Sequence, residues 1–187
     1  MKTESPCWYV MRATYGRERV AFDYIVGQGG EAFYPTTFRK RVTADGKAVL
    51  EEKSLLPNLF FVRATRREAQ SFAHDSIHLP FLRFYYAHHH DGRREPLVVP
   101  NCQIEELRLL CMAKADDTLF VPGTVSKFNV GQRVRIVDGK FKGLCGVLAR
   151  WSGQQRVGIT LSGIGIVATA YVPSAFLEPV EEEKESL

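Results

Sequence analysis

The sequence predicts an N-terminal α+β domain, an antiparallel sheet with helices, followed by a small all-β barrel. Strand-like and helix-like segments alternate over the first 115 residues, and four or five short strand-like segments with glycine turns follow. The stretch between them contains Pro122-Gly123, which is typical of a linker. We therefore predict an α+β domain at 1–116, a linker at 117–129, a barrel at 130–180 and an acidic tail at 181–187.

The first domain begins with a β-rich run at 7–11, which predicts a strand. Apolar residues then recur at helical spacing from Val20 to Ile25, and the glycines from Gly27 to Gly30 end this helix. A short second strand is expected at 31–34.

The middle of this domain contains a hairpin signal, Asp45-Gly46, between strands predicted at 38–43 and 47–54. An apolar central strand is expected at 59–64, and Thr65 with Glu68 forms a capping box that opens a second helix. An aromatic-rich strand at 81–87 and a short strand at 97–99 follow. Asn101 begins a third helix, with Ile104, Leu107 and Cys111 on one face.

The barrel is predicted from the segment between Val134 and Gly146. Two apolar residues alternate with Arg135, as in a half-buried strand, and Asp138-Gly139 supplies a turn. Phe141 follows as an apolar plug, and Gly143 and Gly146 allow tight bends or close backbone approach. Further strands are expected at 146–151, 156–161, 166–172 and 176–177.

Composition is that of a soluble globular protein, with 45% hydrophobic and 25% charged residues. There is no apolar run long enough for a transmembrane helix and no signal peptide, so we expect a cytoplasmic protein without a membrane partner.

The cysteines are far apart and form no C-x-x-C pair, which predicts reduced core cysteines rather than a zinc site. They are Cys7, Cys102, Cys111 and Cys145.

Charge is unevenly distributed over the barrel. Between Val125 and Leu177 there are seven basic residues against one acid, Asp138, whereas the last ten residues hold five glutamates and one lysine. A basic barrel suits phosphate or an acidic protein surface. An ordinary soluble surface with an acidic tail near it is an equally open alternative.

Three stretches together resemble the NusG family of transcription elongation factors: Trp8-Tyr9-Val10, Leu56 to Val62, and the barrel segment from Val134 to Gly146, which resembles a KOW motif. The family joins an N-terminal NGN domain to a C-terminal, SH3-like KOW barrel. The general factor of the family usually has Pro-Gly-Tyr where this chain has Pro57-Asn58-Leu59. The asparagine at this place is similar to the specialised paralogue RfaH. The stretches 97–100 and 163–170 resemble the UpxY branch, antiterminators associated with capsular polysaccharide operons.

The resemblance implies that the first domain binds the clamp helices of the largest RNA polymerase subunit through an apolar patch and suppresses pausing. Strand alternation puts Leu59 and Phe61 on one face and Phe60 and Val62 on the other, and which face meets the polymerase stays open. Burial in the core is the alternative for each residue. The candidate polymerase contacts are Tyr9, Leu56, Pro57, Leu59 and Phe61.

Specialised members of the family also contact the non-template DNA strand, near the junction between the central strand and the second helix. Arginines can hold phosphates, and amide or hydroxyl groups can reach splayed bases. A solvated helix face is the alternative. The candidates are Arg63, Arg66, Arg67, Gln70, Ser71 and His74.

In the barrel, Lys140, Phe141 and Lys142 lie where the family contacts a second partner. The resemblance implies a small-subunit ribosomal protein. The termination factor Rho is doubtful because the loop from Leu161 to Gly165 lacks the aromatic of the general factor. The many β-branched residues favour a stable barrel over RfaH-like fold switching.

The sequence contains no catalytic, nucleotide or metal motif, so we expect a monomeric binding protein without cofactor, metal or enzymatic activity. The run from His88 to His90 predicts a polar hairpin tip rather than a metal site. A KOW-containing RNA-binding protein attached to the ribosome is the second hypothesis. Its affinity would fall steeply with salt, whereas an apolar clamp contact would not.

Overall fold

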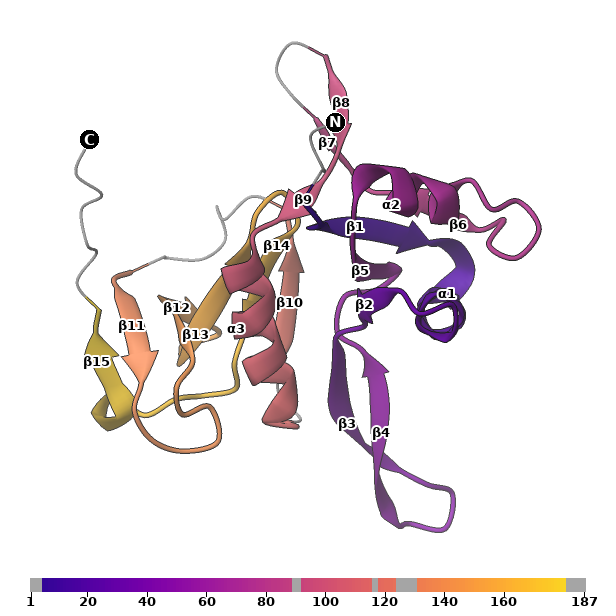
Figure 1. Ribbon diagram of the computed structural model, residues 1–187. Coiled ribbons are helices and arrows are strands. Elements are labelled where there is room, and N and C mark those ends of the chain that lie inside the picture. The colour runs from indigo at the N-terminus through magenta and orange to yellow at the C-terminus, as the bar shows by residue number, and fades with distance from the viewer. Residues whose placement is uncertain (1–4, 89–91, 116–117, 124–130, 181–187) are drawn as a thin grey trace, which may run out of the picture. The chain divides into compact units, whose positions relative to one another are not determined.

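The computed structural model describes residues 5–88, 92–115, 118–123 and 131–180 (Figure 1). The predicted tail at 181–187, much of the predicted linker, and His89 and His90 lie outside these residues. The chain divides into two compact units, Met1–Pro35 with Leu56–Asn101, and Thr36–Leu55 with Cys102–Leu187. The finer domain bounds remain a prediction.

The first unit contains a five-stranded antiparallel sheet in the order β2-β5-β1-β6, with β9 also paired to β1. Tyr9 lies opposite Val62, and Val10 lies opposite Phe61 across the two central strands. The strands are β1 (Cys7–Ala13), β2 (Glu31–Phe33), β5 (Leu59–Ala64), β6 (Leu82–Phe84) and β9 (Val98–Val99).

Two helices cover one face of this sheet. Side chains of α1 (Glu18–Gly27) and α2 (Arg66–Ala73) share a hydrophobic core with Tyr9, Phe60 and Val62. The predicted alternation along β5 is therefore confirmed, and the helices lie on the side of Phe60 and Val62.

The single aromatic strand predicted at 81–87 is wrong. The structure has β6 in the five-stranded sheet and then β7 (Tyr86–His88), which pairs with β8 (Arg94–Pro96) in a separate hairpin. The change of partner occurs at Tyr85, whose N–H donates to the carbonyl of Val10 while its own carbonyl accepts from Leu97. A run of aromatic residues predicts extended backbone but not the strand with which it pairs.

The second unit contains a six-stranded antiparallel sheet in the order β10-β14-β13-β12-β11-β15. All five strands expected there are present, and β10 adds a sixth within the stretch expected to be a linker. A closed barrel of the KOW type remains a prediction. The strands are β10 (Leu119–Pro122), β11 (Arg133–Ile136), β12 (Cys145–Trp151), β13 (Gln154–Leu161), β14 (Gly165–Ala168) and, after η2 (Ser174–Phe176), β15 (Leu177–Pro179).

The same unit contains the hairpin of β3 (Thr36–Val42) and β4 (Ala48–Ser54), and most of helix α3 (Asn101–Met112). The buried residues of α3 are Ile104, Leu107 and Leu110. Cys111, which we expected on that face, is only half-buried.

The prediction of reduced core cysteines is confirmed only in part, because Cys7 packs against the core of the first unit but none of the four side chains is fully covered. All four thiols are free, Cys102 is exposed, and the other three are half-buried. Cys7, Cys102 and Cys145 begin or lie next to the start of an element, where cover is incomplete. Burial raises the pKa of Cys111 to about 12.

Two glycines of the KOW-like segment have the roles that the sequence predicts. Gly139 has φ 84°, so the turn after Asp138 uses the left-handed region. At Gly146, a Cβ atom would lie 2.6 Å from the carbonyl oxygen of Gly158 on the neighbouring strand. The strands β12 and β13 therefore depend on the absence of a side chain at Gly146.

Candidate functional site

A tight turn precedes the central strand β5. The N–H of Leu59 donates to the carbonyl of Leu56 at 3.0 Å, and Asn58 has φ 64°. Proline at the second position and positive φ at the third are the geometry of a type II turn. Asparagine tolerates this φ better than most side chains, so it can replace the more usual glycine.

Asn58 ties this turn to the segment that follows β1. Its N–H donates to Glu18 Oε1 at 2.7 Å, and its side-chain Oδ1 accepts from the N–H of Gly16 at 3.3 Å. Its carbonyl accepts from the N–H of Ala13 at 2.9 Å. Glu18 is buried at the first residue of α1, where the helix dipole favours a carboxylate. The turn at residues 56–59 and the short 3-10 helix η1 (Thr14–Gly16) that follows β1 are thus joined by hydrogen bonds, and we call these two segments the joined turns.

The apolar residues exposed on these joined turns are Tyr15 and Pro57. Tyr15 is 90% exposed and has φ 62°, an unusual value for a bulky side chain. Left-handed backbone costs such a residue roughly 1–2 kcal/mol. We call Tyr15, Gly16 and Pro57 the Tyr15–Pro57 surface. The sequence interpretation missed Tyr15, although an aromatic residue before a glycine at the end of a strand was the available signal.

The residues predicted as polymerase contacts do not form one exposed face. Tyr9 lies in the core with α1 and α2, whereas Leu59 and Phe61 point to the opposite side of the sheet. Phe61 is fully buried and stacks on Phe33 with ring centroids 6.1 Å apart. Leu56 is also fully buried, so Pro57 alone of the five is exposed. Large side chains on central strands gain more free energy when they are covered than when they remain in water.

The residues predicted to contact DNA are all exposed. Arg66, Arg67, Gln70 and Ser71 on α2, and His74 directly after it, lie away from the buried Ala69 and Ala73. Their role in DNA binding remains a prediction.

Arg63 lies next to α2 in a different electrostatic environment. Its Nη1 is 3.0 Å from Glu31 Oε2, and both residues line a pocket of about 400 Å³ with Glu68 and Ser71. The pocket brings Arg63 and Ser71 together, but its two carboxylates would oppose a phosphate.

The predicted capping box of α2 is confirmed. The N–H and hydroxyl of Thr65 each donate to Glu68 Oε2 at 2.8 Å, and the hydroxyl accepts from the N–H of Glu68 at 3.4 Å. The backbone hydrogen bond from Thr65 is the main reason why the pKa of Glu68 lies below its usual value.

We expect Glu68→Gln to lower the urea midpoint of the first unit at about pH 7 and to lower it by less at about pH 3. Because folding lowers the pKa of Glu68, its stabilisation is present above the unfolded-state pKa and is lost as the pH falls through the folded-state value. Thr65→Ala, which removes the hydroxyl partner, serves as the matched variant. A difference between wild type and Glu68→Gln that is the same at both pH values would contradict this.

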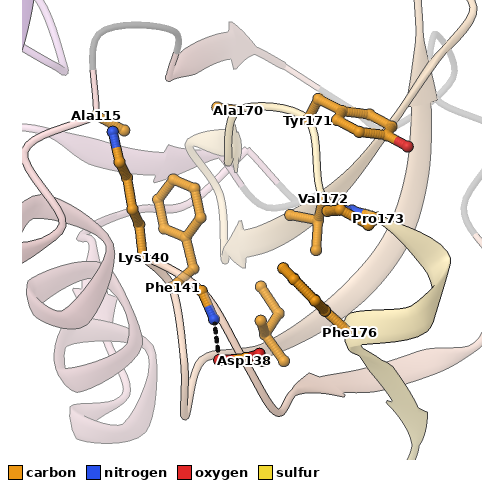
Figure 2. Close-up of a pocket in the computed structure, with 11 residues that line it drawn as sticks. Ala115, Asp138, Lys140, Phe141, Ala170, Tyr171, Val172, Pro173 and Phe176 are labelled. Carbon is orange, nitrogen blue, oxygen red and sulfur yellow. Dashed lines mark hydrogen bonds between the residues drawn. The ribbon is translucent and has the colours of Figure 1, made fainter.

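In the second unit, Phe141 lines a pocket of about 250 Å³. Figure 2 shows its ring facing the same space as Val172 and Phe176. Phe141 is only 7% exposed, whereas Lys140, which also lines the pocket, and Lys142 are exposed. Phe141 is therefore a wall of this pocket rather than a projecting contact.

Two basic residues of the second unit make hydrogen bonds or ion pairs with other residues of the same unit. Arg156 is buried and donates to the carbonyl of Thr169 at 2.9 Å and to Gln154 Oε1 at 3.0 Å. Arg133 Nη2 lies 3.1 Å from Glu106 Oε1. The exposed positive surface is thus smaller than the sequence suggests.

Within the described parts of the chain, no three His, Cys, Asp or Glu side chains are grouped so that they could hold a metal ion. Over the same residues, no helix has both the length and the apolar character needed to cross a membrane.

A family model described as "Transcription termination factor nusG" matches residues 6–108, more than half of the chain. The matched region includes the five-stranded sheet, the Tyr15–Pro57 surface and α2. A comparison with curated proteins found no match. From its sheet, its turns and this match over residues 6–108, the chain belongs to the NusG family.

Proposed function

We propose that this protein is a transcription elongation factor of the antiterminating type that binds the clamp helices of the largest RNA polymerase subunit. NusG-family proteins are transcription factors, not enzymes, and they generally interact with RNA polymerase. The observation that carries the proposal is the family match over residues 6–108, which covers the sheet and its joined turns. Bound in this way, the protein would suppress pausing without chemistry of its own.

The Tyr15–Pro57 surface is the part of the first unit that we assign to direct polymerase contact. A rigid aromatic side chain held in solvent loses little conformational entropy on binding, and tyrosine is enriched among interface hot spots. The hydrogen bonds of Asn58 fix the two turns relative to each other.

We expect Tyr15→Asn in the full-length protein to weaken binding to a clamp-helix fragment by about tenfold or more. Asparagine suits the positive φ of Tyr15, so the variant should fold at least as well as wild type while it lacks the ring. Biolayer interferometry measures the binding, and a pausing assay with purified polymerase measures the function.

Tyr171→Asn is the control, since Tyr171 is also an exposed tyrosine but belongs to the second unit. It should bind the fragment like wild type. If folded Tyr15→Asn binds normally, the assignment of the surface fails. If wild type binds neither the fragment nor polymerase, the proposed function fails.

Finer assignments rest on the sequence stretches. Pro57-Asn58-Leu59 and the stretches 97–100 and 163–170 support a specialised, UpxY-like or RfaH-like paralogue that serves polysaccharide operons. We propose that α2 meets non-template DNA. We further propose that the second unit is a KOW barrel that binds a small-subunit ribosomal protein, but not Rho, through Lys140, Phe141 and Lys142. The protein would act as a cytoplasmic monomer.

A further inference from the structure

The β3–β4 hairpin has two chemically different faces. Its strands pair antiparallel, with Arg39 opposite Glu51, Lys40 opposite Leu50 and Arg41 opposite Val49. Successive side chains of a strand point to opposite faces, and directly opposed residues share a face. Residues with odd numbers therefore lie on one face of this hairpin and those with even numbers on the other. Figure 1 shows the two strands as a long ribbon.

The odd-numbered face is cationic. Arg39, Arg41 and Lys53 lie on it, and Lys47 continues the same alternation at the end of the turn, just before β4. All four residues are exposed, and the side chain of Arg41 is 71% exposed. On the paired strands Glu51 is the one acid of this face, and it is shared between Arg41 at 3.9 Å and Lys53 at 3.7 Å. The turn between the strands adds a second exposed acid, Asp45. With its turn, this face thus carries four cations against two carboxylates.

The even-numbered face is close to neutral and largely apolar. Lys40 is its one cation and Glu52 its one acid within 36–54. Val42 is 68% exposed and Leu50 is 56% exposed. The two faces of the ribbon therefore differ mainly in charge, although they share the same strands.

The hairpin is held to the rest of its unit at its base and is closed by its own hydrogen bond at its tip. At its base, the hydroxyl of Thr37 donates to the carbonyl of Ala115 at 3.2 Å, and Lys114 Nζ lies 5.8 Å from the ring centroid of Phe38. At its tip, the N–H of Thr43 donates to the carbonyl of Lys47 at 2.9 Å. The cations are consequently presented as a regular row, with neighbours on one strand about 7 Å apart.

We propose that the odd-numbered face of this hairpin binds the phosphate backbone of nucleic acid. Guanidinium groups pair with phosphate through two hydrogen bonds, and a row of cations matches a polyanion. A two-stranded ribbon also has the width that the major groove of a duplex admits. The inference rests on the proposed function, since an elongation factor bound to polymerase works beside nucleic acid. It adds a site separate from α2.

We expect Arg39→Glu to weaken binding of the full-length protein to nucleic acid by about tenfold or more, and Lys40→Glu by about twofold or less. These neighbouring, exposed residues undergo the same change of charge on opposite faces. Fluorescence anisotropy is measured with three labelled probes: a short DNA duplex, one of its strands, and an RNA hairpin. The probe that binds best identifies the source of the phosphates.

If the probe is a duplex, the double variant Arg39→Ala, Arg41→Ala loses two phosphate contacts. A plot of log affinity against log salt concentration, between about 50 mM and 200 mM, should then be shallower than that of wild type by about 2 in slope. Equal weakening by Arg39→Glu and Lys40→Glu would show a general effect of net charge and overturn the proposal, as would a wild type that binds none of the probes. Circular dichroism establishes that each variant is folded. Arg39→Glu should still bind the clamp-helix fragment, so failure at the hairpin and failure of the proposed function are separable.

Discussion

Phe61→Ala should lower the free energy of unfolding of the first unit by about 3–5 kcal/mol. Phe61 is fully buried on a central strand, lies opposite Val10 and stacks on Phe33. Truncation removes the transfer free energy of the ring and leaves a cavity, because neighbours on a sheet can relax only slightly. Urea denaturation followed by the fluorescence of Trp8 measures the change, in a Trp151→Phe background that leaves a single tryptophan.

Pro57→Ala is the control, because Pro57 is exposed on the turn that precedes the same strand. It should change stability by about 1 kcal/mol or less, because alanine restores only backbone freedom to the unfolded chain. If Phe61→Ala lowers the free energy of unfolding by less than about 1 kcal/mol, the ring is not enclosed in solution. Phe61 would then again be a candidate for direct contact with the polymerase.

Gly146→Ala should destabilise the second unit by about 3 kcal/mol. The added Cβ would lie 2.6 Å from the carbonyl oxygen of Gly158 and 2.8 Å from a methyl group of Val157. A backbone oxygen cannot move aside as a flexible side chain can, so β12 and β13 would have to separate. The fluorescence of Trp151, at the end of β12, reports this unfolding in a Trp8→Phe background.

Gly27→Ala makes the same chemical change where nothing lies within 4 Å of the added atom. Gly27 is the last residue of α1, so alanine there should be neutral or should stabilise the first unit by up to about 1 kcal/mol. Equal tolerance of both alanine variants would show that β12 and β13 do not approach closely at Gly146.

Local chemistry in the sequence determined most elements of this protein. The Thr65–Glu68 capping box begins α2 where predicted, and the apolar run at 59–64 is β5 at the predicted residues. Asp45-Gly46 marks the turn of the β3–β4 hairpin. Each of these signals acts between residues close in the chain, so no knowledge of distant partners is needed. The family resemblance rested on similar short stretches, and the match over residues 6–108 confirms the family.

Only the tertiary structure decided which faces are covered. Alternation along β5 separates Leu59 and Phe61 from Phe60 and Val62, but a strand whose two faces are both apolar does not reveal which one the helices cover. Tyr15 is exposed on a turn held by Asn58, which lies about forty residues away in the chain and hydrogen-bonds with Gly16 and Glu18. Likewise, β10 pairs with β14 more than forty residues later. Pairing and burial depend on contacts between residues that are distant in the chain, and such contacts leave little trace in the local pattern.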